Sequence, residues 1–325
     1  MGKETKTVYV FHHTDLDGMG CRLIGEEYAK RKGYEVQCFR VGYDEVDRAI
    51  QSVCNNINLF SLQDSSEIII GDISVNEESS YMLSNFYNLG MNLILRDHHA
   101  TAEWLNKFHW AEVYENIDGV SRCGTWQLAR CFPDIMEDYK ELIEQIDQWD
   151  TWKWKVNDNQ YAKKLNNLHK IMGDNEFIKY AKQLVGASQP QELFNDTANL
   201  LISIQNRGVQ ETVNKCMRNL IESEIEVGDT TYRTGLVFAS SNFSEVADII
   251  LSERTDLDIL GVVNLPFSIS WRTQKELDTP LGDIARMSTG KGGGHPKASG
   301  SVIPKNFCKY VLRYLFKDKE LMIKI

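Results

Sequence analysis

Apolar runs and amphipathic stretches follow one another along the first 110 residues. Short runs rich in Val, Ile and aromatic residues predict strands, and the stretches between them, with apolar residues at helical spacing, predict helices. The expected strands are 5–13, 35–42, 66–74 and 91–99, and the expected helices are 18–33, 44–60, 77–90 and 102–108. Strand–helix alternation at this spacing predicts a parallel, doubly wound α/β sheet.

The pattern becomes mostly helical from about residue 120 to 228, with helices expected at 125–132, 135–146 and 198–224. Strands then return. They are expected at 231–240, 257–265 and 267–273, before a Gly-rich loop at 289–303 and a terminal helix at 308–316. The chain of 325 residues is therefore expected to have an N-terminal α/β domain (1–155), a helical connector (156–228) and a smaller C-terminal α/β domain (229–325).

Acidic residues and histidines follow three of the predicted strands of the first domain. They are His13, Asp15 and Asp17 after the first strand, Asp72 after the third, and Asp97, His98 and His99 after the fourth. Ligands of open α/β sheets bind outside the carboxyl ends of the strands, so these side chains are expected to meet at one edge. A fourth acidic contribution is expected from Asp150, with Asp147 as the less favoured alternative.

This donor set of carboxylates and imidazoles lacks a thiolate and suits Mn²⁺ or Mg²⁺ better than Fe or Zn. Asp15 and Asp17 are only two residues apart. Two carboxylates about 4 Å apart repel each other by roughly 4 kcal/mol at an effective dielectric near 20, unless cations offset the repulsion. A lone Asp after a strand is usually a turn or N-cap residue. Because such residues follow three strands, a metal site is the better explanation, and the ligands suffice for two ions, the arrangement that serves displacement at phosphorus.

A second candidate site lies in the C-terminal domain. Its Gly-rich stretch contains Gly292, Gly293, Gly294, His295 and Lys297. Consecutive glycines let backbone N–H groups crowd an anion, and the two side chains add donors. Arg272, at the end of a predicted strand, can bind a phosphate through two hydrogen bonds. The alternative is a flexible turn that carries a surface lysine.

The amino-acid composition limits which classes of ligand the protein is expected to bind. A net charge of −10 argues against a broad surface for long duplex nucleic acid, but a few local cations and a metal can still bind a small phosphorylated ligand. Seven scattered cysteines without a CxxC pair indicate reduced thiols in a cytoplasmic protein and argue against a cysteine-based zinc site. The sequence has no run of about 18 apolar residues, so no membrane span is expected.

These motifs resemble those of the DHH/DHHA1 phosphoesterase family. The D-H-H signature is Asp97-His98-His99, and the opening H-x-D-x-D-G runs from His13 to Gly18. The lone aspartate of the second motif is Asp72, and the aspartate followed by threonine is Asp150. The C-terminal GGGHxxA(A/S)G spans 292–300, with Ser299 at the variable position. Within the family, the stretches SVNEE, DTWKW and AKKLNNL are most similar to the NrnB-type oligoribonucleases.

The resemblance implies two divalent ions, Mn²⁺ first and Mg²⁺ as the alternative. One ion would be held by His13, Asp15 and Asp72, and the other by Asp17, Asp72, His98 and Asp150, with Asp72 bridging. His99 would contact the scissile phosphate or assist proton transfer, and Asp97 would orient the neighbouring histidines. Substrate would be bound by Arg272, Gly292, Gly293, Gly294, His295 and Lys297.

The implied activity is hydrolysis of short single-stranded oligonucleotides or dinucleotides to nucleoside monophosphates. Alternatives with the same chemistry are a phosphatase on 3′-phosphoadenosine 5′-phosphate, a phosphodiesterase on cyclic or linear dinucleotides, and a pyrophosphatase. A non-catalytic nucleotide-binding module would require a broken metal motif, and the four motifs are intact. The polarity of attack, RNA or DNA preference, substrate length and oligomeric state stay open, a homodimer among the alternatives.

Overall fold

The computed structural model describes residues 6–57, 66–265, 268–294 and 296–304. By its internal contacts the chain divides into two compact units, Met1–Ile202 and Ser203–Ile325. The three-part division at 155/156 and 228/229 stays a prediction, and the two units are described one after the other.

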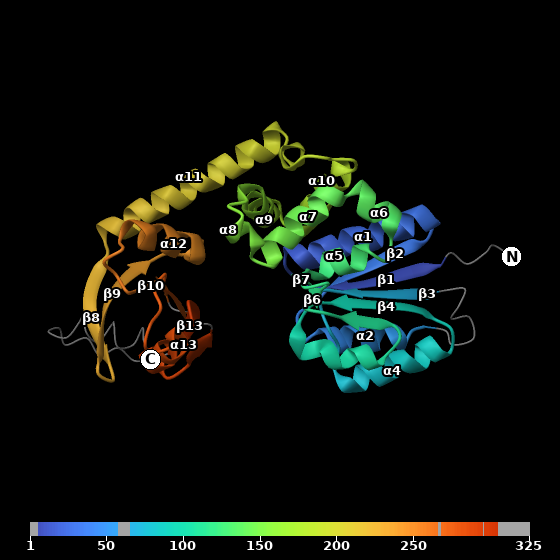
Figure 1. Ribbon diagram of the computed structural model, residues 1–325, viewed down its shortest axis with the longest axis horizontal. Helices are drawn as coiled ribbons and strands as arrows, with labels where there is room; N and C mark the ends of the chain where they lie inside the picture. Colours follow the sequence, from blue (N-terminus) through green and yellow to red (C-terminus); the bar gives the residue numbers. More distant parts are fainter. Residues whose placement is uncertain (1–5, 58–65, 266–267, 295, 305–325) are drawn as a thin grey trace, which may run out of the picture. The chain divides into compact units, whose positions relative to one another are not determined.

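The first unit is built on a five-stranded parallel sheet of order β2-β1-β3-β4-β5 (Figure 1). The strands are β1 (Thr7–His12), β2 (Glu35–Arg40), β3 (Ser66–Gly71), β4 (Asn92–Asp97) and β5 (Ala111–Val113). The predicted α/β fold with a doubly wound parallel sheet is thus confirmed. Because the strand order reverses between β1 and β3, their carboxyl ends form the switch point where such sheets bind ligands.

Helices cover both faces of this sheet (Figure 1). One face carries α1 (Leu16–Lys32), α5 (Gly124–Ala129), α6 (Pro133–Asp138), α7 (Lys140–Asp150), α9 (Gln160–Met172) and α10 (Asp174–Ala181). The other carries α2 (Val46–Cys54), α4 (Glu77–Asn88) and the 3₁₀ helix η2 (Ala100–Lys107). Shorter elements are β6 (Asn116–Ile117), β7 (Val120–Ser121), α8 (Lys153–Val156), η3 (Lys182–Leu184) and η4 (Pro190–Leu193).

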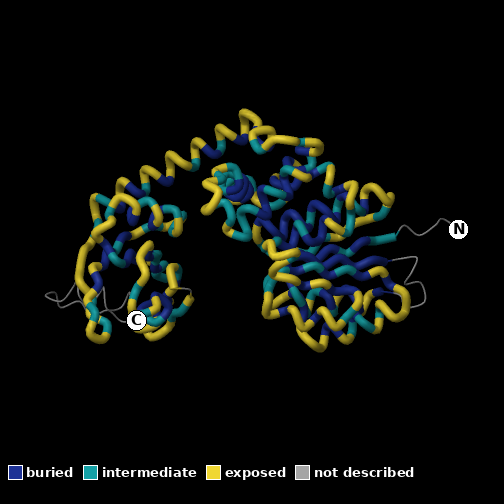
Figure 2. Tube along the Cα trace, viewed as in Figure 1, coloured by how far each residue is buried: buried dark blue, intermediate teal, exposed yellow. Residues whose placement is uncertain are grey.

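The apolar run of β3 explains why both faces are covered. Ile69 packs into the core beneath α1, whereas Ile68 and Ile70 pack into the core on the other face. Successive side chains of a strand point to opposite faces, so a continuous apolar run needs helices on both. Figure 2 shows the middle of the sheet as the buried centre of this unit, with every residue of β3 buried, whereas the edge strand β2 is exposed or half-buried.

Helix α1 ends as its sequence predicts. Gly33 adopts the left-handed conformation, with φ 70°, and its N–H and that of Tyr34 bond to carbonyls of the last turn. Glycine is favoured there because it has no Cβ to clash.

The second unit holds a mixed six-stranded sheet of order β12-β13-β11-β10-β9-β8. Its elements are β8 (Ile221–Val227), β9 (Thr230–Phe238), α12 (Phe243–Glu253), β10 (Ile259–Asn264), β11 (Ser268–Arg272), α13 (Leu281–Thr289), β12 (Gly292–Gly294) and β13 (Ala298–Val302). Helix α11 (Asp196–Arg218) begins in the first unit and ends in the second. The smaller C-terminal α/β domain is therefore also confirmed.

Two local predictions in this unit were wrong. The predicted helix 198–224 ends at Arg218, because the following residues form β8 and pair with β9 across a turn at Gly228. The predicted Gly-rich loop forms β12 and β13, since β11 supplies a partner for β13. The lack of side chains at the glycines permits this, as a Cβ on Gly292 would lie 2.6 Å from the Ala285 carbonyl oxygen. The expected terminal helix 308–316 lies outside the described residues.

Within the described ranges, no helix has both the length and the apolar character needed to span a membrane.

Candidate metal centre

The acidic and histidine residues from three strand ends and from the end of α7 meet at one place. Groups of them offer ligand atoms that lie within 4.8 Å of one another. These groups are His13, Asp15 and Asp72; Asp17, His98 and Asp150; and Asp72, Asp97, His98 and His99. The fold thus brings together all the residues that the sequence nominates as metal ligands.

Asp72 lies between two histidines. Its Oδ1 is 3.3 Å from His98 Nε2, and its Oδ2 is 3.8 Å from His13 Nδ1. His98 Nε2 in turn lies 3.4 Å from Asp150 Oδ2 and 3.7 Å from Asp17 Oδ2. A central carboxylate whose two oxygens face two different histidines has the placement expected of a bridging ligand.

The backbone at Asp72 departs from the strand at once. The residue follows β3, takes φ 58°, and its N–H donates to the Arg96 carbonyl oxygen at 2.9 Å. Asp and Asn tolerate this left-handed region better than most residues, although it still costs free energy. Such strain, held in place by neighbouring contacts, is typical of functional sites.

Two carboxylate oxygens in the cluster are buried without a hydrogen bond. Asp72 Oδ2 and Asp150 Oδ2 have no hydrogen-bond partner among the described residues. Burial, and then the charges of Asp17 and Asp15, raise the pKa of Asp72 well above its ordinary value and that of Asp150 to about 8. A divalent cation would satisfy both oxygens and offset the repulsion, so the residues present fit such an ion.

Asp15 and Asp17 also make the capping contacts that lone aspartates usually make. Asp15 is the N-cap of α1, where its Oδ1 accepts from the Gly18 N–H at 3.0 Å. The Asp17 carboxylate accepts from the N–H groups of Gly124 and Thr125, at 2.7 and 2.8 Å, at the start of α5. A carboxylate has about four lone-pair positions, so these contacts leave room for a cation.

Asp97 occupies a buried position beside both histidines of its motif. Its Oδ1 accepts from the His98 backbone N–H and pairs with His99 Nδ1, each at 2.7 Å, and its Oδ2 accepts from the Ser74 hydroxyl at 2.5 Å. Burial opposes ionisation of Asp97, but these hydrogen bonds hold its pKa below the ordinary value. The bond to Asp97 raises the pKa of His99. This is the geometry expected of a residue that orients imidazoles.

The alternative acidic residue, Asp147, is engaged elsewhere. Its buried carboxylate accepts from the Cys123 N–H at 2.8 Å, from Arg122 at 3.0 Å and from Lys153 at 2.6 Å. Because Asp147 is already paired with two cations, Asp150 is the carboxylate that α7 supplies to the cluster.

The candidate substrate residues lie in the second unit. Arg272 ends β11, where its guanidinium donates to the Trp271 carbonyl oxygen at 2.8 Å and to the Ser244 hydroxyl at 2.9 Å. It pairs in register with Ala298, and Lys297 forms an ion pair with Glu276 at 2.7 Å. Arg272 therefore lies beside the first residue of β13. His295 lies outside the described residues, and the role of these residues toward the metal cluster stays a prediction.

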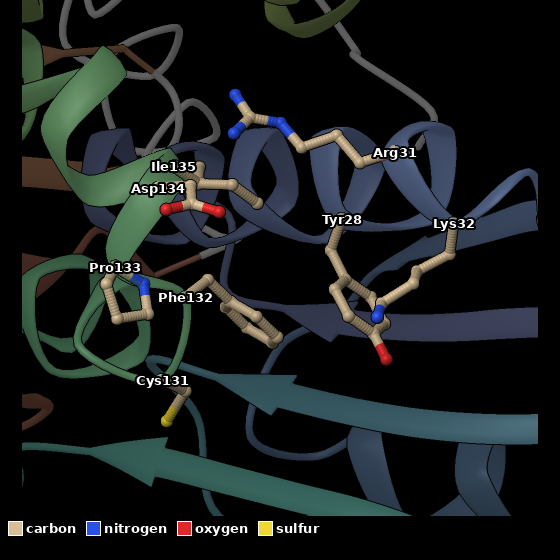
Figure 3. A pocket seen from close by; sticks show the side chains of 8 residues that line it. All are labelled: Tyr28, Arg31, Lys32, Cys131, Phe132, Pro133, Asp134 and Ile135. Carbon is tan, nitrogen blue, oxygen red and sulfur yellow. The ribbon is translucent and has the colours of Figure 1, made fainter.

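A pocket of about 480 Å³ lies at the far end of α1 from the cluster (Figure 3). Tyr28 and Phe132 face each other in it, with ring centroids 4.6 Å apart, and Arg31 lies on its rim. Asp17 and Arg31 are both in α1, which rises about 1.5 Å per residue, so pocket and cluster are roughly 20 Å apart along this helix. The acidic cluster, not this pocket, is the candidate site of chemistry.

Comparison with known proteins bears on this site. No family model matches the sequence. Oligoribonuclease NrnB of Bacillus subtilis is 27% identical over 303 residues, covering 91% of this chain and 72% of that protein. A 3′,5′-cyclic-nucleotide phosphodiesterase of Helicobacter pylori is 24% identical over 335 residues, covering 91% and 92%.

Solved structures share the fold. A DHH domain from a member of a family of ribosomal proteins gives a TM-score of 0.58 at 13% identity, covering 97% of this chain and 87% of that one. RecJ of Thermus thermophilus in complex with Mn²⁺ gives 0.51 at 13% identity, covering 95% and 51%. The resemblance to the DHH family is confirmed. Among DHH proteins, the sequence of this chain is similar to NrnB.

Sequence reasoning missed two residues that shape this DHH-like centre. Tyr43, after β2, places its hydroxyl 3.0 Å from His99 Nε2. Gly124 lets α5 approach, since a Cβ there would lie 2.7 Å from Asp72 Cβ and 3.0 Å from Asp17 Oδ2. Neither belongs to a motif. The only available signal was the position of Tyr43 just beyond a predicted strand.

Proposed function

We propose that this chain is a divalent-metal-dependent phosphodiesterase that cleaves short oligonucleotides and dinucleotides to nucleoside monophosphates. The observation that carries the proposal is that one buried oxygen each of Asp72 and Asp150 lacks a hydrogen bond and faces a histidine at the switch point of the sheet. Both curated relatives are phosphoesterases by name, which bears out the prediction of a phosphoesterase. The similarity to NrnB supports the choice of short oligonucleotides.

The proposed ligands follow the two groups in the cluster. His13, Asp15 and Asp72 would hold one ion, and Asp17, Asp72, His98 and Asp150 would hold the other. Mn²⁺ is the proposed metal and Mg²⁺ the alternative, because the described part of the cluster offers carboxylates and imidazoles without a thiolate. When bound, such ions supply Lewis acidity beside the phosphate.

The chain's own groups would then bind and orient the substrate. Asp97 holds His99 through Nδ1, and Nε2 bonds to the Tyr43 hydroxyl at 3.0 Å, so a substrate oxygen would take the place of that hydroxyl at Nε2. Asp97 raises the pKa of His99 and so favours its imidazolium form. The imidazolium would donate a hydrogen bond, or its proton, to an oxygen of the substrate. Arg272 and the glycines of β12 would bind a second part of the substrate.

A phosphodiesterase on cyclic nucleotides is the second candidate, favoured by the name of the Helicobacter relative. Both reactions break a phosphodiester bond and would use the same residues. The difference lies in the size and shape of the bound substrate.

Product analysis tests the proposal. The purified chain would be assayed with an end-labelled five-mer RNA, a linear dinucleotide, 3′,5′-cyclic AMP and 3′-phosphoadenosine 5′-phosphate, each with Mn²⁺, Mg²⁺ or EDTA. We expect fastest turnover of the short oligonucleotides, with nucleoside monophosphates as products, and none with EDTA. Faster turnover of the cyclic nucleotide or of the bisphosphate would reassign the substrate, and full activity in EDTA would reject the metal centre.

Asp72→Asn separates metal binding from folding. Asn tolerates the φ of 58° and removes one of the crowded charges, so the metal-free variant should be at least as stable as the wild type. Activity should fall by at least about 100-fold, the upper end for residues that merely support a ligand. Mn²⁺ at about 100 times its Kd should stabilise the wild type by about 2.7 kcal/mol but not the variant, as measured by thermal melting.

Asp134→Asn, at an exposed position of α6, is the matched control and should keep both activity and the Mn²⁺ effect. An Asp72→Asn variant that retains the Mn²⁺-induced rise in Tm would remove Asp72 from the metal site.

A further inference from the structure

The short segment after Asp150 exposes a large aromatic side chain beside the metal centre. Trp152, at the turn from α7 into α8, is 62% exposed and has φ 61°. A bulky residue in the left-handed region is a genuine outlier and is unfavourable, as is an exposed indole. Neither feature benefits the fold, so both point to a function.

The neighbours of Trp152 explain how this conformation persists. The Trp152 N–H donates to the Trp149 carbonyl oxygen at 3.2 Å, which closes α7. The Lys153 ammonium donates to buried Asp147 at 2.6 Å, and Trp154 stacks on Trp149 with ring centroids 5.1 Å apart. Lys153 and Trp154 are thus held by contacts with Asp147 and Trp149, and the side chain of Trp152 is left at the surface.

One lysine lies over this exposed ring and another over the neighbouring Trp154 ring, although the chain carries a net charge of −10. The Lys155 ammonium lies 4.3 Å from the centroid of the Trp152 ring and 5.5 Å from that of Trp154. Lys163 lies 5.8 Å from the Trp154 ring. Aromatic rings interleaved with cations are the mark of surfaces that bind single-stranded nucleic acid, since bases stack on the rings and cations follow the phosphates.

Trp152 is close in the chain to a residue of the metal cluster. Only one residue separates it from Asp150, whose Oδ2 lies 3.4 Å from His98 Nε2. The Cα atoms of Asp150 and Trp152 can be at most about 7 Å apart. The backbone of Trp152 therefore lies no farther from that of Asp150 than about the length of one nucleotide.

We propose that Trp152 is a stacking platform for one nucleobase of the substrate, with Lys155 as the cation beside it. The proposal rests on the proposed function and deepens it, because it names the feature that selects nucleotides among phosphodiesters. Stacking uses the π-face that every base has, so this platform selects for a base without reading its identity.

Steady-state kinetics of Trp152→Gly test the platform, because Gly accepts the φ of 61° and the variant should fold. On a ribodinucleotide we expect KM to rise about tenfold, within the range for the loss of one stacked base, with kcat within about twofold of the wild type. Trp152→Tyr should restore most of the affinity. Tyr87→Leu, which removes an exposed aromatic ring from the last turn of α4, should leave KM unchanged.

Two further dinucleotides, abasic at the first or the second position, identify the stacked base. For the substrate that lacks this base, KM should already be high in the wild type and unaffected by Trp152→Gly. An unchanged KM of Trp152→Gly on the intact dinucleotide, with an active wild type, would reject the platform alone. If the wild type fails to cleave the dinucleotide, the proposed function is rejected, and the platform with it.

Discussion

At the scale of single residues, the centre holds several carboxylates close together, and specific contacts offset part of their mutual repulsion. Asp17 is neutralised in part by the N–H groups of Gly124 and Thr125, and Asp97 by His99. Asp72 and Asp150 keep one unpartnered oxygen each within the described part of the chain. The site therefore stores unfavourable free energy that a cation would release.

Gly124→Ala tests how tight this crowd is. An added Cβ would lie 2.7 Å from Asp72 Cβ, and no flexible side-chain end can yield there, so α5 or Asp72 must shift. We expect the free energy of unfolding to fall by about 1–3 kcal/mol. Activity should fall further than the loss of folded protein at the assay temperature explains. Urea unfolding and kinetics measure the two effects.

Gly208→Ala is the matched control for this substitution. It is a glycine in α11 with open space around its Cβ position, so the variant should be stabilised by about 0.5–1 kcal/mol with unchanged kinetics. If Gly124→Ala behaves like Gly208→Ala, the close approach of α5 is not needed.

At the scale of elements, α1 links the metal centre to the rest of its unit. Its N-terminus carries Asp15 and Asp17, and in its middle Glu26 pairs with Arg22 at 2.6 Å and with Lys182 of η3 at 2.7 Å. Burial opposes ionisation of Glu26, but its partners hold its pKa below the ordinary value. Glu26 therefore fixes α1 in its ionised form.

Because the pKa of Glu26 is lowered in the folded state, the effect of Glu26→Gln on stability depends on pH. A carboxyl whose pKa is lower in the folded state stabilises the fold above its unfolded pKa of about 4.3, and this contribution is lost as the pH falls through the folded pKa. We expect the free energy of unfolding of Glu26→Gln to be lower than that of the wild type by about 1–3 kcal/mol at pH 7, and by progressively less below pH ~4. Urea titrations across pH measure the difference.

Exposed Glu176, paired with Lys179 on α10, supplies the control. Glu176→Gln should change stability little at any pH. A loss in Glu26→Gln that is equal at pH 7 and pH 3 would show that packing, not charge, stabilises the contact.

At the scale of the whole molecule, the proposed metal ligands and the proposed substrate-binding residues belong to different units. The carboxylates and histidines belong to the first unit, and Arg272 and the glycines of β12 belong to the second. A net charge of −10 makes long nucleic acid a poor ligand, because affinity for it needs many phosphate contacts. A few placed cations are then expected to govern KM.

Arg272→Ala is expected to raise KM for a dinucleotide roughly tenfold or more, as the loss of a charged hydrogen bond implies, with kcat little changed. Arg233→Ala, at an exposed ion pair of β9 with Glu222, should change neither constant. Steady-state kinetics on both variants decide the matter. An unaltered KM for Arg272→Ala would exclude this residue from substrate binding.

The sequence by itself determined the parallel sheet and the residue types at its edge. The apolar run of β3 and the acidic residues after β1, β3 and β4 are local patterns, and the edge rule then places them together. Only the tertiary structure showed that Asp147 is engaged by Cys123 and Lys153, and that the Gly-rich stretch forms β12 and β13.

The reason is sequence distance. Gly124 bonds Asp17 from 107 residues away, and Tyr43 reaches His99 from 56 away, and no local periodicity encodes such pairs. The same holds for Trp152, whose exposure depends on where Trp149 and Lys153 find their partners. Patterns fix which face of an element is buried, whereas packing decides which distant residue fills the space beside it.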